Sequence, residues 1–357
     1  MKKLMTMILA VVLVVSVFTG CGKTEEPKKE EVKQETAKQE EKKEEKKEEP
    51  AKEEPKMEEV ELNIAYMPNY GSLWSIQNAI AQGYLAEQGI KVNLVEFQDG
   101  PTIIAAMESG SIDIGYIGQG AHKLSINGKV KIFALSHLSN GDALIGGKGI
   151  TKVEDLKGKK VAYSSGSSSE DILLNSLDMV GMKMADIQAF DMDPAAIVTA
   201  MLSGSVDACA TWSPNTIKIL DEMKDATKLT DNVTFSDKTV SLASWIVTPK
   251  YAETKRDIVL RFTKALFKAM DYAANDHQEE TAELIAKQVA QTKDIVFPQR
   301  GDAKWLTGKE VAQGAADGTV EQYYELQKQQ FIKAGAVEVN PAVSEYVMLD
   351  IMIEAGK

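Results

Sequence analysis

The residues with the clearest chemical potential in this sequence lie in a serine-rich segment, Ser164 to Ser169, which holds five serines and one glycine. A helical pattern begins directly after it. A serine-rich turn at the start of a helix presents backbone N–H groups and hydroxyls that together can bind an anion. The same serines can instead cap the helix, because the hydroxyl of Ser168 or Ser169 can accept a hydrogen bond from a backbone N–H. Both interpretations stay open from the residues alone.

Acidic and aromatic side chains near this and other polar segments indicate a cation rather than an anion as the ligand. The acids are Asp99, Asp142, Glu170 and Asp171, and the tryptophans are Trp74, Trp212 and Trp245. Carboxylates together with ring faces are what a small organic cation, such as guanidinium or an amine, requires. Structural roles compete with this interpretation, since acids suit the first turn of a helix and tryptophans suit a packed core. Trp305 lies far along the chain in a polar setting, and we assign it no role.

The sequence offers little for catalysis or for metal binding. Its three histidines, His122, His137 and His277, lack the spacing of metal ligands. It contains no Gly-x-Ser-x-Gly nucleophile elbow, no Walker loop and no complete dinucleotide fingerprint. We therefore expect a protein that is not an enzyme and that holds neither a cofactor nor a metal ion.

The polar segments need secondary-structure elements to hold them in place. Strand patterns cover residues 61–65, 91–97, 112–117, 130–135, 161–163, 186–190, 206–211 and 244–247, and helical patterns cover 74–88, 101–109 and 169–180. This alternation predicts an α/β fold with open, mostly parallel sheets covered by helices. From Lys255 onward the pattern is helical, with one apolar face formed by Ile258, Val259, Phe262, Leu266 and Met270.

An internal repeat indicates two related lobes. Residues 106–113 (AMESGSID) recur as residues 200–207 (AMLSGSVD) at a constant offset of 94 residues, with Pro101 and Pro194 upstream of the two copies. In each copy a helical run ends at a glycine, the residue that caps helices in the left-handed conformation, and a short strand follows. Two similar lobes on one chain predict a ligand-binding cleft between them.

Open α/β sheets bind ligands at the carboxyl ends of their strands, where the polar segments of this chain lie. We therefore expect the ligand to contact side chains from several of these segments. The expected contacts are Asn69, Tyr70, Gln119, Asn140, Ser167, Ser168, Glu170 and Trp212.

The first 58 residues predict export and membrane attachment. Two lysines precede an apolar run from Leu4 to Phe18, and a Thr-Gly-Cys sequence ends at Cys21, which is the pattern of a secretion signal. Small residues directly before a cysteine resemble a bacterial lipobox, and this resemblance implies cleavage before Cys21 and lipidation of its sulfur. Residues 23–58 hold 11 Lys and 14 Glu without an apolar face, so we expect a solvated tether.

Charge and cysteine content narrow the alternatives further. The formal net charge of −12 argues against nucleic acid as a partner, because binding its phosphates requires basic patches. Cys209 is the only cysteine after Cys21, so it has no partner for an internal disulfide, and we expect a buried, inert thiol.

Three groups of residues resemble bacterial solute-binding proteins for nitrate, taurine and aliphatic sulfonates. They are Gly100-Pro101 to Gly115 followed by Gly118, Asp155 to Val161 followed by Gly166-Ser167, and Gly204 to Ala208 ending in Trp212. The resemblance implies a two-lobed periplasmic-binding-protein-like fold with the ligand in the cleft. It also implies delivery of that ligand to the permease and ATPase subunits of an ABC importer. Wider relatives include binders of thiamine-precursor pyrimidines.

The chain departs from this family's pattern at one informative position. Sulfonate and taurine binders often carry a histidine near the start of the helix after the Gly-Ser turn, where this chain has Glu170. A carboxylate facing the cleft would repel a sulfonate. Three ligand classes therefore stay open: a sulfonate, taurine or nitrate anion, a small organic cation, and a neutral pyrimidine-like heterocycle. A surface adhesion lipoprotein would explain the anchor and the tether but not two α/β lobes.

We expect a signal peptide at residues 1–20, a lipidated cysteine and tether at 21–58, one lobe at 59–148 plus 250–357, and a second lobe at 149–249. The chain would cross between the lobes near Gly146 and near Thr248, and closure around the ligand would be a hinge motion. These expectations describe a monomeric receptor held to the cell membrane on its extracytoplasmic face by a lipid.

Overall fold

The structure, a computed structural model, describes residues 58–357, so the predicted signal peptide, Cys21 and the tether lie outside the described residues. One set of strands comprises β1 (Val60–Tyr66), β2 (Ile90–Glu96), β3 (Ile114–Ile117), β4 (Lys131–Ser139), β10 (Leu242–Val247) and β11 (Ala303–Trp305). A second set comprises β5 (Asp142–Gly146), β6 (Lys160–Tyr163), β7 (Gln188–Asp191), β8 (Ala208–Trp212) and β9 (Thr227–Asp231). The first sheet has the order β11-β4-β10-β3-β1-β2 and the second has the order β7-β6-β8-β5-β9.

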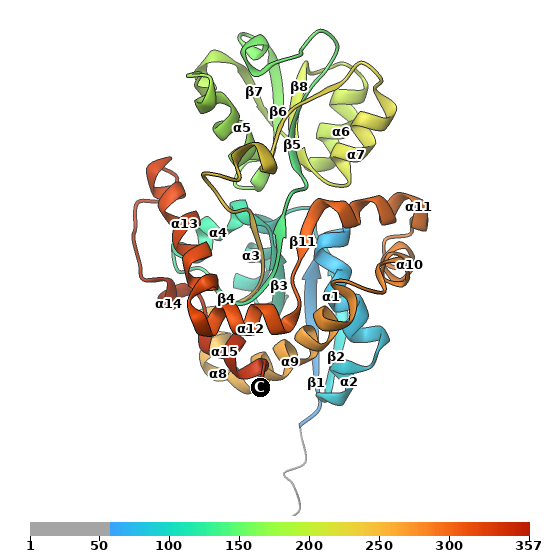
Figure 1. Cartoon of the computed structure of the whole chain (residues 1–357), viewed down its shortest axis with the longest axis vertical. Coiled ribbons are helices and arrows are strands. Elements are labelled where there is room, and N and C mark those ends of the chain that lie inside the picture. The colour runs from blue at the N-terminus through green and yellow to red at the C-terminus, as the bar shows by residue number, and fades with distance from the viewer. Residues whose placement is uncertain (1–57) are drawn as a thin grey trace, which may run out of the picture. The chain divides into compact units, whose positions relative to one another are not determined.

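Each sheet has the helices of its own lobe packed around it (Figure 1). The first lobe contains α1 (Tyr70–Ala81), α2 (Tyr84–Glu87), α3 (Gly100–Glu108), η1 (Gln119–Ala121), α4 (His122–Ile126), α8 (Pro249–Thr254), α9 (Arg256–Ala273), α10 (Gln278–Gln288), α11 (Lys293–Val296), η5 (Phe297–Asp302), α12 (Gly308–Asp317), α13 (Thr319–Lys333), α14 (Val343–Tyr346) and α15 (Leu349–Ala355). The second contains η2 (Val153–Leu156), α5 (Ser168–Met179), η3 (Met184–Asp186), α6 (Pro194–Leu202), α7 (Asn215–Glu222) and η4 (Asn232–Phe235). Among the described residues no helix is long and apolar enough to cross a membrane.

The predicted two-lobed α/β fold is confirmed, and the sheets are mixed. In the first sheet β1 pairs in parallel with β2 and β3, and in the second β6 pairs in parallel with β7 and β8. Each sheet also contains a central antiparallel strand. These strands are β10, between β3 and β4, and β5, between β8 and β9.

The pairing of the two antiparallel strands shows that the expected crossing points between the lobes were wrong. β5 pairs with β8 in the second sheet, so the chain enters the second lobe between Ser139 and Asp142 rather than near Gly146. β10 pairs with β3 in the first sheet, so the chain has returned by Leu242 rather than near Thr248. The lobe boundaries at 148 and 249 were therefore placed too late. β5 and β10 are the first strands after the two crossings. A strand pattern in the sequence does not reveal to which sheet a strand belongs.

The internal repeat is a structural repeat. α3 and α6 each end before a glycine with positive φ, 82° at Gly110 and 70° at Gly204. The last residue of each copy then bonds to the neighbouring strand. Asp113 accepts from the backbone N–H of Asn63 at 2.9 Å, and Asp207 accepts from that of Lys160 at 2.8 Å. The aspartate of each copy thus ties the strand that follows it to a parallel neighbour, β3 to β1 in the first lobe and β8 to β6 in the second.

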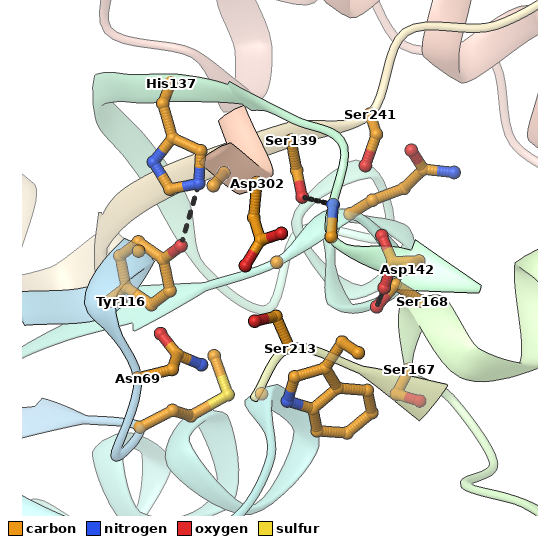
Figure 2. A pocket seen from close by; sticks show the side chains of 18 of the residues that line it. Asn69, Tyr116, His137, Ser139, Asp142, Ser167, Ser168, Ser213, Ser241 and Asp302 are labelled. Carbon is orange, nitrogen blue, oxygen red and sulfur yellow. Dashed lines mark hydrogen bonds between the residues drawn. The ribbon is translucent and has the colours of Figure 1, made fainter. Parts of the chain in front are cut away.

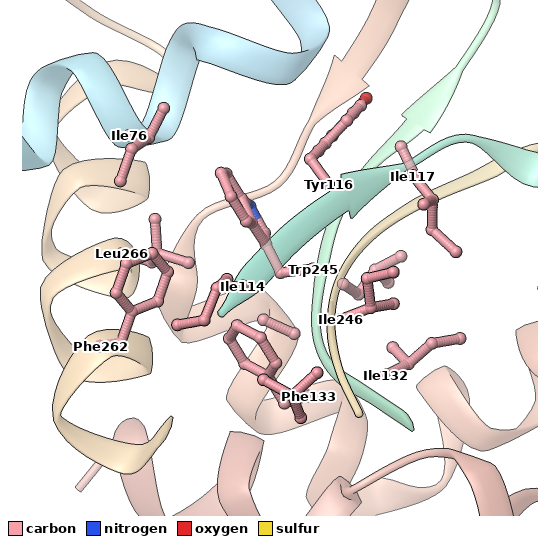
Figure 3. Packing of buried hydrophobic residues seen from close by; sticks show 14 of the residues in the cluster. Ile76, Ile114, Tyr116, Ile117, Ile132, Phe133, Trp245, Ile246, Phe262 and Leu266 are labelled. Atoms are coloured by element: carbon pink, nitrogen blue, oxygen red, sulfur yellow. The ribbon is translucent and has the colours of Figure 1, made fainter. Parts of the chain in front are cut away.

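The core of the first lobe is built on the apolar face predicted for the C-terminal helices. Phe262 of α9 is fully buried and packs edge-on against Phe133 and Trp245, with ring centroids 6.0 and 5.8 Å apart (Figure 3). Trp74 and Trp245 have no exposed surface. Their rings therefore belong to the core, and the structural alternative weighed for these tryptophans is the correct one.

Two further predictions, the helix at 74–88 and the buried thiol of Cys209, can be compared with the structure. The helix expected at 74–88 begins at Tyr70, because the Asn69 side chain accepts from the N–H of Ser72 at 2.8 Å and caps it. It breaks at Gly83, whose φ of 75° is left-handed. Cys209 is a buried free thiol, as expected, and burial raises its pKa to about 12.

The two lobes touch where η1 meets the start of α5. Gly120 lies so close to α5 that a Cβ at this position would fall 2.0 Å from the carbonyl carbon of Ser167 and 2.5 Å from the nitrogen of Ser168. Both are backbone atoms and cannot move aside as a side chain can. The lobes can therefore approach this closely only because Gly120 has no side chain.

We expect the substitution Gly120→Ala to separate the lobes, because the added methyl group overlaps backbone rather than a flexible side chain. Overpacking of this kind costs about 1–3 kcal/mol. Small-angle X-ray scattering should show a larger radius of gyration for G120A. The matched control is Gly118→Ala, since a Cβ at Gly118 meets nothing within 4 Å. Equal radii for G120A, G118A and the unaltered protein would contradict this account of the contact.

Candidate functional site

A pocket of about 80 Å³ lies between the lobes. The first lobe contributes the segments after β1, β3 and β4, together with η5 and β11, and the second contributes the start of β5, the start of α5 and the end of β8. Parallel strands of both sheets thus end at the pocket, which is the expected location in open α/β sheets. A buried water needs about 10–15 Å³, so the pocket suits a molecule of roughly five to eight non-hydrogen atoms.

Five of the eight predicted contact residues line this pocket, and Figure 2 shows several of them. They are Asn69, Gln119, Ser167, Ser168 and Trp212. The other three, Tyr70, Asn140 and Glu170, are not among the residues that line it. Whether the five contact a ligand stays a prediction.

The three residues outside the pocket have other roles. Tyr70 is 1% exposed, and its ring packs against Trp305 with centroids 5.0 Å apart. Asn140 is exposed, and its backbone N–H donates to the carbonyl of Asp302 at 2.6 Å. Of the three, only Asn140 lies in a loop, as expected, while Tyr70 is the first residue of α1 and Glu170 lies in the first turn of α5.

Glu170 takes part in an ion-pair cluster between the lobes. Lys123 of α4 places its Nζ 3.5 Å from Glu170 and 2.8 Å from Asp171, both on α5. Glu170 also accepts from the backbone N–H of Gly166 at 3.0 Å. Two of the four acids that the sequence analysis named for a cation, Glu170 and Asp171, are therefore paired with a lysine of the protein itself.

The serine-rich turn uses most of its hydrogen-bond donors internally. The donating groups, at 2.9–3.2 Å from side-chain oxygens, are the backbone N–H groups of Ser164, Ser165, Gly166 and Ser169. Ser167 is the residue that caps α5. Four of the six backbone N–H groups of the turn are thus paired within the second lobe, and the cap is Ser167 rather than the expected Ser168 or Ser169. The N–H groups of Ser167 and Ser168, two residues that line the pocket, have no hydrogen bond among the described residues.

Asp142 is a buried carboxylate held in place from the second lobe. One of its oxygens accepts from the hydroxyl of Ser168 and the other accepts from the amide of Asn232 at 3.0 Å. Asn232 also accepts from the backbone N–H of Asp142 at 2.8 Å. Burial raises the pKa of Asp142 to about 6, although these donors favour its charged form.

Asp302 supplies a second carboxylate from the first lobe. Its Oδ2 atom is buried and has no hydrogen-bond partner among the described residues. Burial raises its pKa as well, while the nearby hydroxyl of Ser213 and the charge of Lys228 lower it. Gln119 adds another unpaired acceptor, because its Oε1 is buried without a partner in the described part of the chain. Buried acceptors of this kind require donors, so the pocket is matched to a molecule rich in N–H groups.

The remaining wall is aromatic and uncharged. Trp212 and Trp305 line the pocket together with Tyr116 and His137. Burial lowers the pKa of His137 to about 3, so its imidazole is neutral at physiological pH. Among the described residues that line the pocket there is no lysine and no arginine. The site therefore combines two carboxylates with ring faces and carries no compensating positive side chain. No group of His, Cys, Asp and Glu within residues 58–357 is arranged to hold a metal ion.

Sequence reasoning missed several of the residues that line the pocket. Asp302 and Trp305 come from η5 and β11, about 90 residues beyond the repeat, and no motif ties them to the strand-end loops. Trp305 was assigned no role. Tyr116 lies inside a strand pattern and His137 lies just beyond the end of one, so each was readily taken for a structural residue. Of the two acids that line the pocket, Asp142 was named from the sequence but Asp302 was not.

Comparisons with known proteins agree with this arrangement. The family model described as "NMT1/THI5 like" matches residues 74–280. A binding protein of Brucella abortus is 26% identical over 291 residues, which cover 82% of this chain and 91% of the relative. The taurine-binding periplasmic protein of Escherichia coli is 31% identical over 197 residues, covering 54% of this chain and 61% of the relative.

A solved structure shows the same fold. The alkanesulfonate-binding protein SsuA of Xanthomonas axonopodis, bound to MOPS, superposes with a TM-score of 0.63 at 21% identity, covering 81% of this chain and 99% of that one. The resemblance that the sequence motifs indicated is thereby confirmed. With the family model covering more than half of the chain, the protein belongs to the NMT1/THI5-like family of solute-binding proteins of ABC importers.

Proposed function

We propose that this protein is the lipid-anchored, extracytoplasmic receptor of an ABC importer and that it captures a small solute bearing a positively charged nitrogen. The observation that carries the proposal is the buried, unpaired Oδ2 atom of Asp302, which lies in a pocket with a second carboxylate and without a basic side chain. A guanidinium or ammonium group would donate to Asp302 and Asp142 and would offset their charge. The rings of Trp212 and Trp305 would pack against it.

The alternatives satisfy the site less well. A nitrate or a simple alkylsulfonate would add a negative charge beside two carboxylates. Two like charges about 4 Å apart repel by about 4 kcal/mol at an effective dielectric constant of about 20. A neutral pyrimidine-like heterocycle could donate hydrogen bonds but would leave the carboxylates without a counter-charge. Taurine differs from a simple sulfonate because it carries an ammonium group, so it remains compatible with the proposal.

Membrane attachment rests on the sequence pattern at Cys21. Two acyl chains suffice for stable anchoring, and the charged tether would allow the binding lobes to reach the importer. Delivery to permease and ATPase subunits is what membership of the family supports. A noncatalytic, monomeric role is part of the same proposal.

Calorimetric titration with two matched solute pairs tests the charge requirement. We expect guanidinium to bind and nitrate not to bind, and taurine to bind more tightly than ethanesulfonate, which lacks the amine. Asp302→Asn should weaken guanidinium binding by tenfold to a hundredfold, because a hydrogen bond to a charged group contributes about 1.5–3 kcal/mol. The matched control is Asp225→Asn, which alters an exposed acid. Binding of nitrate and ethanesulfonate in preference to their partners would refute the proposal.

Acidification should weaken the binding of guanidinium. The cation requires the ionised carboxylate, and the pKa of Asp142 is raised to about 6, so affinity should fall by up to tenfold per pH unit below pH 6. Without ligand, the effect of acidification on the stability of the folded protein has the opposite sign. A raised carboxylate pKa contributes stability that is present below pH 3.8 and is lost as the pH rises towards 6.

Guanidinium keeps its own charge throughout this range, so the titration reports on the protein alone. Asp142→Asn should flatten the part of the profile that Asp142 causes. An affinity that is equal at pH 5 and pH 7 in the unaltered protein would show that no carboxylate of the pocket holds the ligand.

A further inference from the structure

A chain of buried polar groups ends at the pocket opposite Asp142. The indole N–H of Trp74 donates to the hydroxyl of Ser136 at 3.0 Å. That hydroxyl lies 3.1 Å from Nδ1 of His137, and Nε2 of His137 lies 3.4 Å from the hydroxyl of Tyr116. Tyr116 lines the pocket, and in Figure 2 it lies on the side away from Asp142.

The direction of these bonds can be worked out by counting donors. Trp74 can only donate, so Ser136 accepts from it and must place its own hydrogen elsewhere. Among the described residues, Nδ1 of His137 is the only other group bonded to that hydroxyl. If Nδ1 carried the proton, the hydroxyl hydrogen of Ser136, a residue with no exposed surface, would have no acceptor. An unpaired buried donor disfavours that tautomer by roughly 5- to 100-fold.

The favoured tautomer carries its proton on Nε2, which then donates to the oxygen of Tyr116. The hydroxyl hydrogen of Tyr116 is left to point into the pocket. Asn69 supplies a second donor nearby, because its Oδ1 accepts from the N–H of Ser72 at 2.8 Å and its amide nitrogen has no hydrogen bond within residues 58–357. Figure 2 shows that amide on the same side of the pocket as Tyr116.

We propose that His137 is a positioning residue that the chain from Trp74 and Ser136 holds as the neutral Nε2–H tautomer, so that Tyr116 donates a hydrogen bond to an acceptor atom of the solute. This inference deepens the proposed function, on which it rests. Asp302 and Asp142 select a positively charged nitrogen at one end of the site. Tyr116 and Asn69 select an oxygen or another acceptor at the other end. The solute class is therefore a small molecule that carries a positively charged nitrogen at one end and a hydrogen-bond acceptor at the other.

Gly71 makes room for this arrangement. A Cβ at this position would lie 3.1 Å from Cε1 of His137 and 3.2 Å from the hydroxyl oxygen of Tyr116. The imidazole also packs against the ring of Trp305, with centroids 4.8 Å apart. The ring is thus held from two sides, and the hydrogen bonds decide where its proton lies.

Nitrogen NMR of the protein labelled with ¹⁵N-histidine tests the tautomer directly. The chain has three histidines, and H137N identifies the signals of His137. We expect the Nε2–H pattern without change from pH 5 to pH 8. Ser136→Ala should remove the preference for this tautomer. Ser244→Ala should leave it in place, since Ser244 is an equally buried serine that bonds to Tyr324 and not to His137. An Nδ1–H pattern in the unaltered protein, or titration of His137 in this range, would overturn the inference.

Binding of two probes tests the role of Tyr116. Taurine has acceptor oxygens and guanidinium has none. We expect Tyr116→Phe to weaken taurine binding by tenfold to a hundredfold and to change guanidinium binding by less than about twofold. An equal change for both probes, or no change for either, would overturn the assigned role of Tyr116.

Binding of the two probes to the unaltered protein separates the proposed function from the proposed role of Tyr116. Binding of guanidinium but not of taurine would overturn the acceptor-recognising end while supporting the proposed function. Binding of neither probe would refute the proposed function, and the NMR pattern would then decide on the tautomer alone.

Discussion

The approach of Gly120 to the backbone of Ser167 and Ser168 is the contact on which the binding site depends. It brings η1 of one lobe against the first turn of α5 of the other, and the pocket lies beside this contact with walls from both lobes. Lys123, one turn further along the chain, reaches the same helix and pairs with Glu170 and Asp171. A close backbone contact and an ion pair thus occur together, and neither lobe could enclose a solute alone.

This contact also explains why the charges of the pocket are one-sided. Lys123 is already committed to two acids of α5, and four of the six backbone N–H groups of the serine-rich turn are committed to side chains of their own lobe. The pocket is lined by the carboxylates of Asp142 and Asp302 without a basic side chain, and Asp302 Oδ2 and Gln119 Oε1 are buried without a partner within residues 58–357. Relatives named for taurine or alkanesulfonates share the fold, but the fold does not determine the charge of the ligand.

The sequence predicted the features that depend on local pattern. The alternation of strands and helices, the apolar face of α9 and the repeated Asp at the start of β3 and β8 follow from periodicity and from glycine caps, and the structure contains them. The positions of polar loops at strand ends were also predictable, which is why five of eight expected residues line the pocket. Asp302 and Trp305 were not predictable, because their place in the pocket results from the packing of η5 and β11 against distant strands. Glu170 was misjudged because a sequence does not show that Lys123 lies opposite it.

The binding of a positively charged nitrogen against buried carboxylates is the central claim to test. A crystal structure of the complex with the most tightly bound solute tests this claim most directly. The account predicts the nitrogen of the solute at hydrogen-bond distance, about 2.7–3.0 Å, from Oδ2 of Asp302. A sulfonate, carboxylate or nitrate oxygen in that position, or a solute bound outside the pocket, would contradict it.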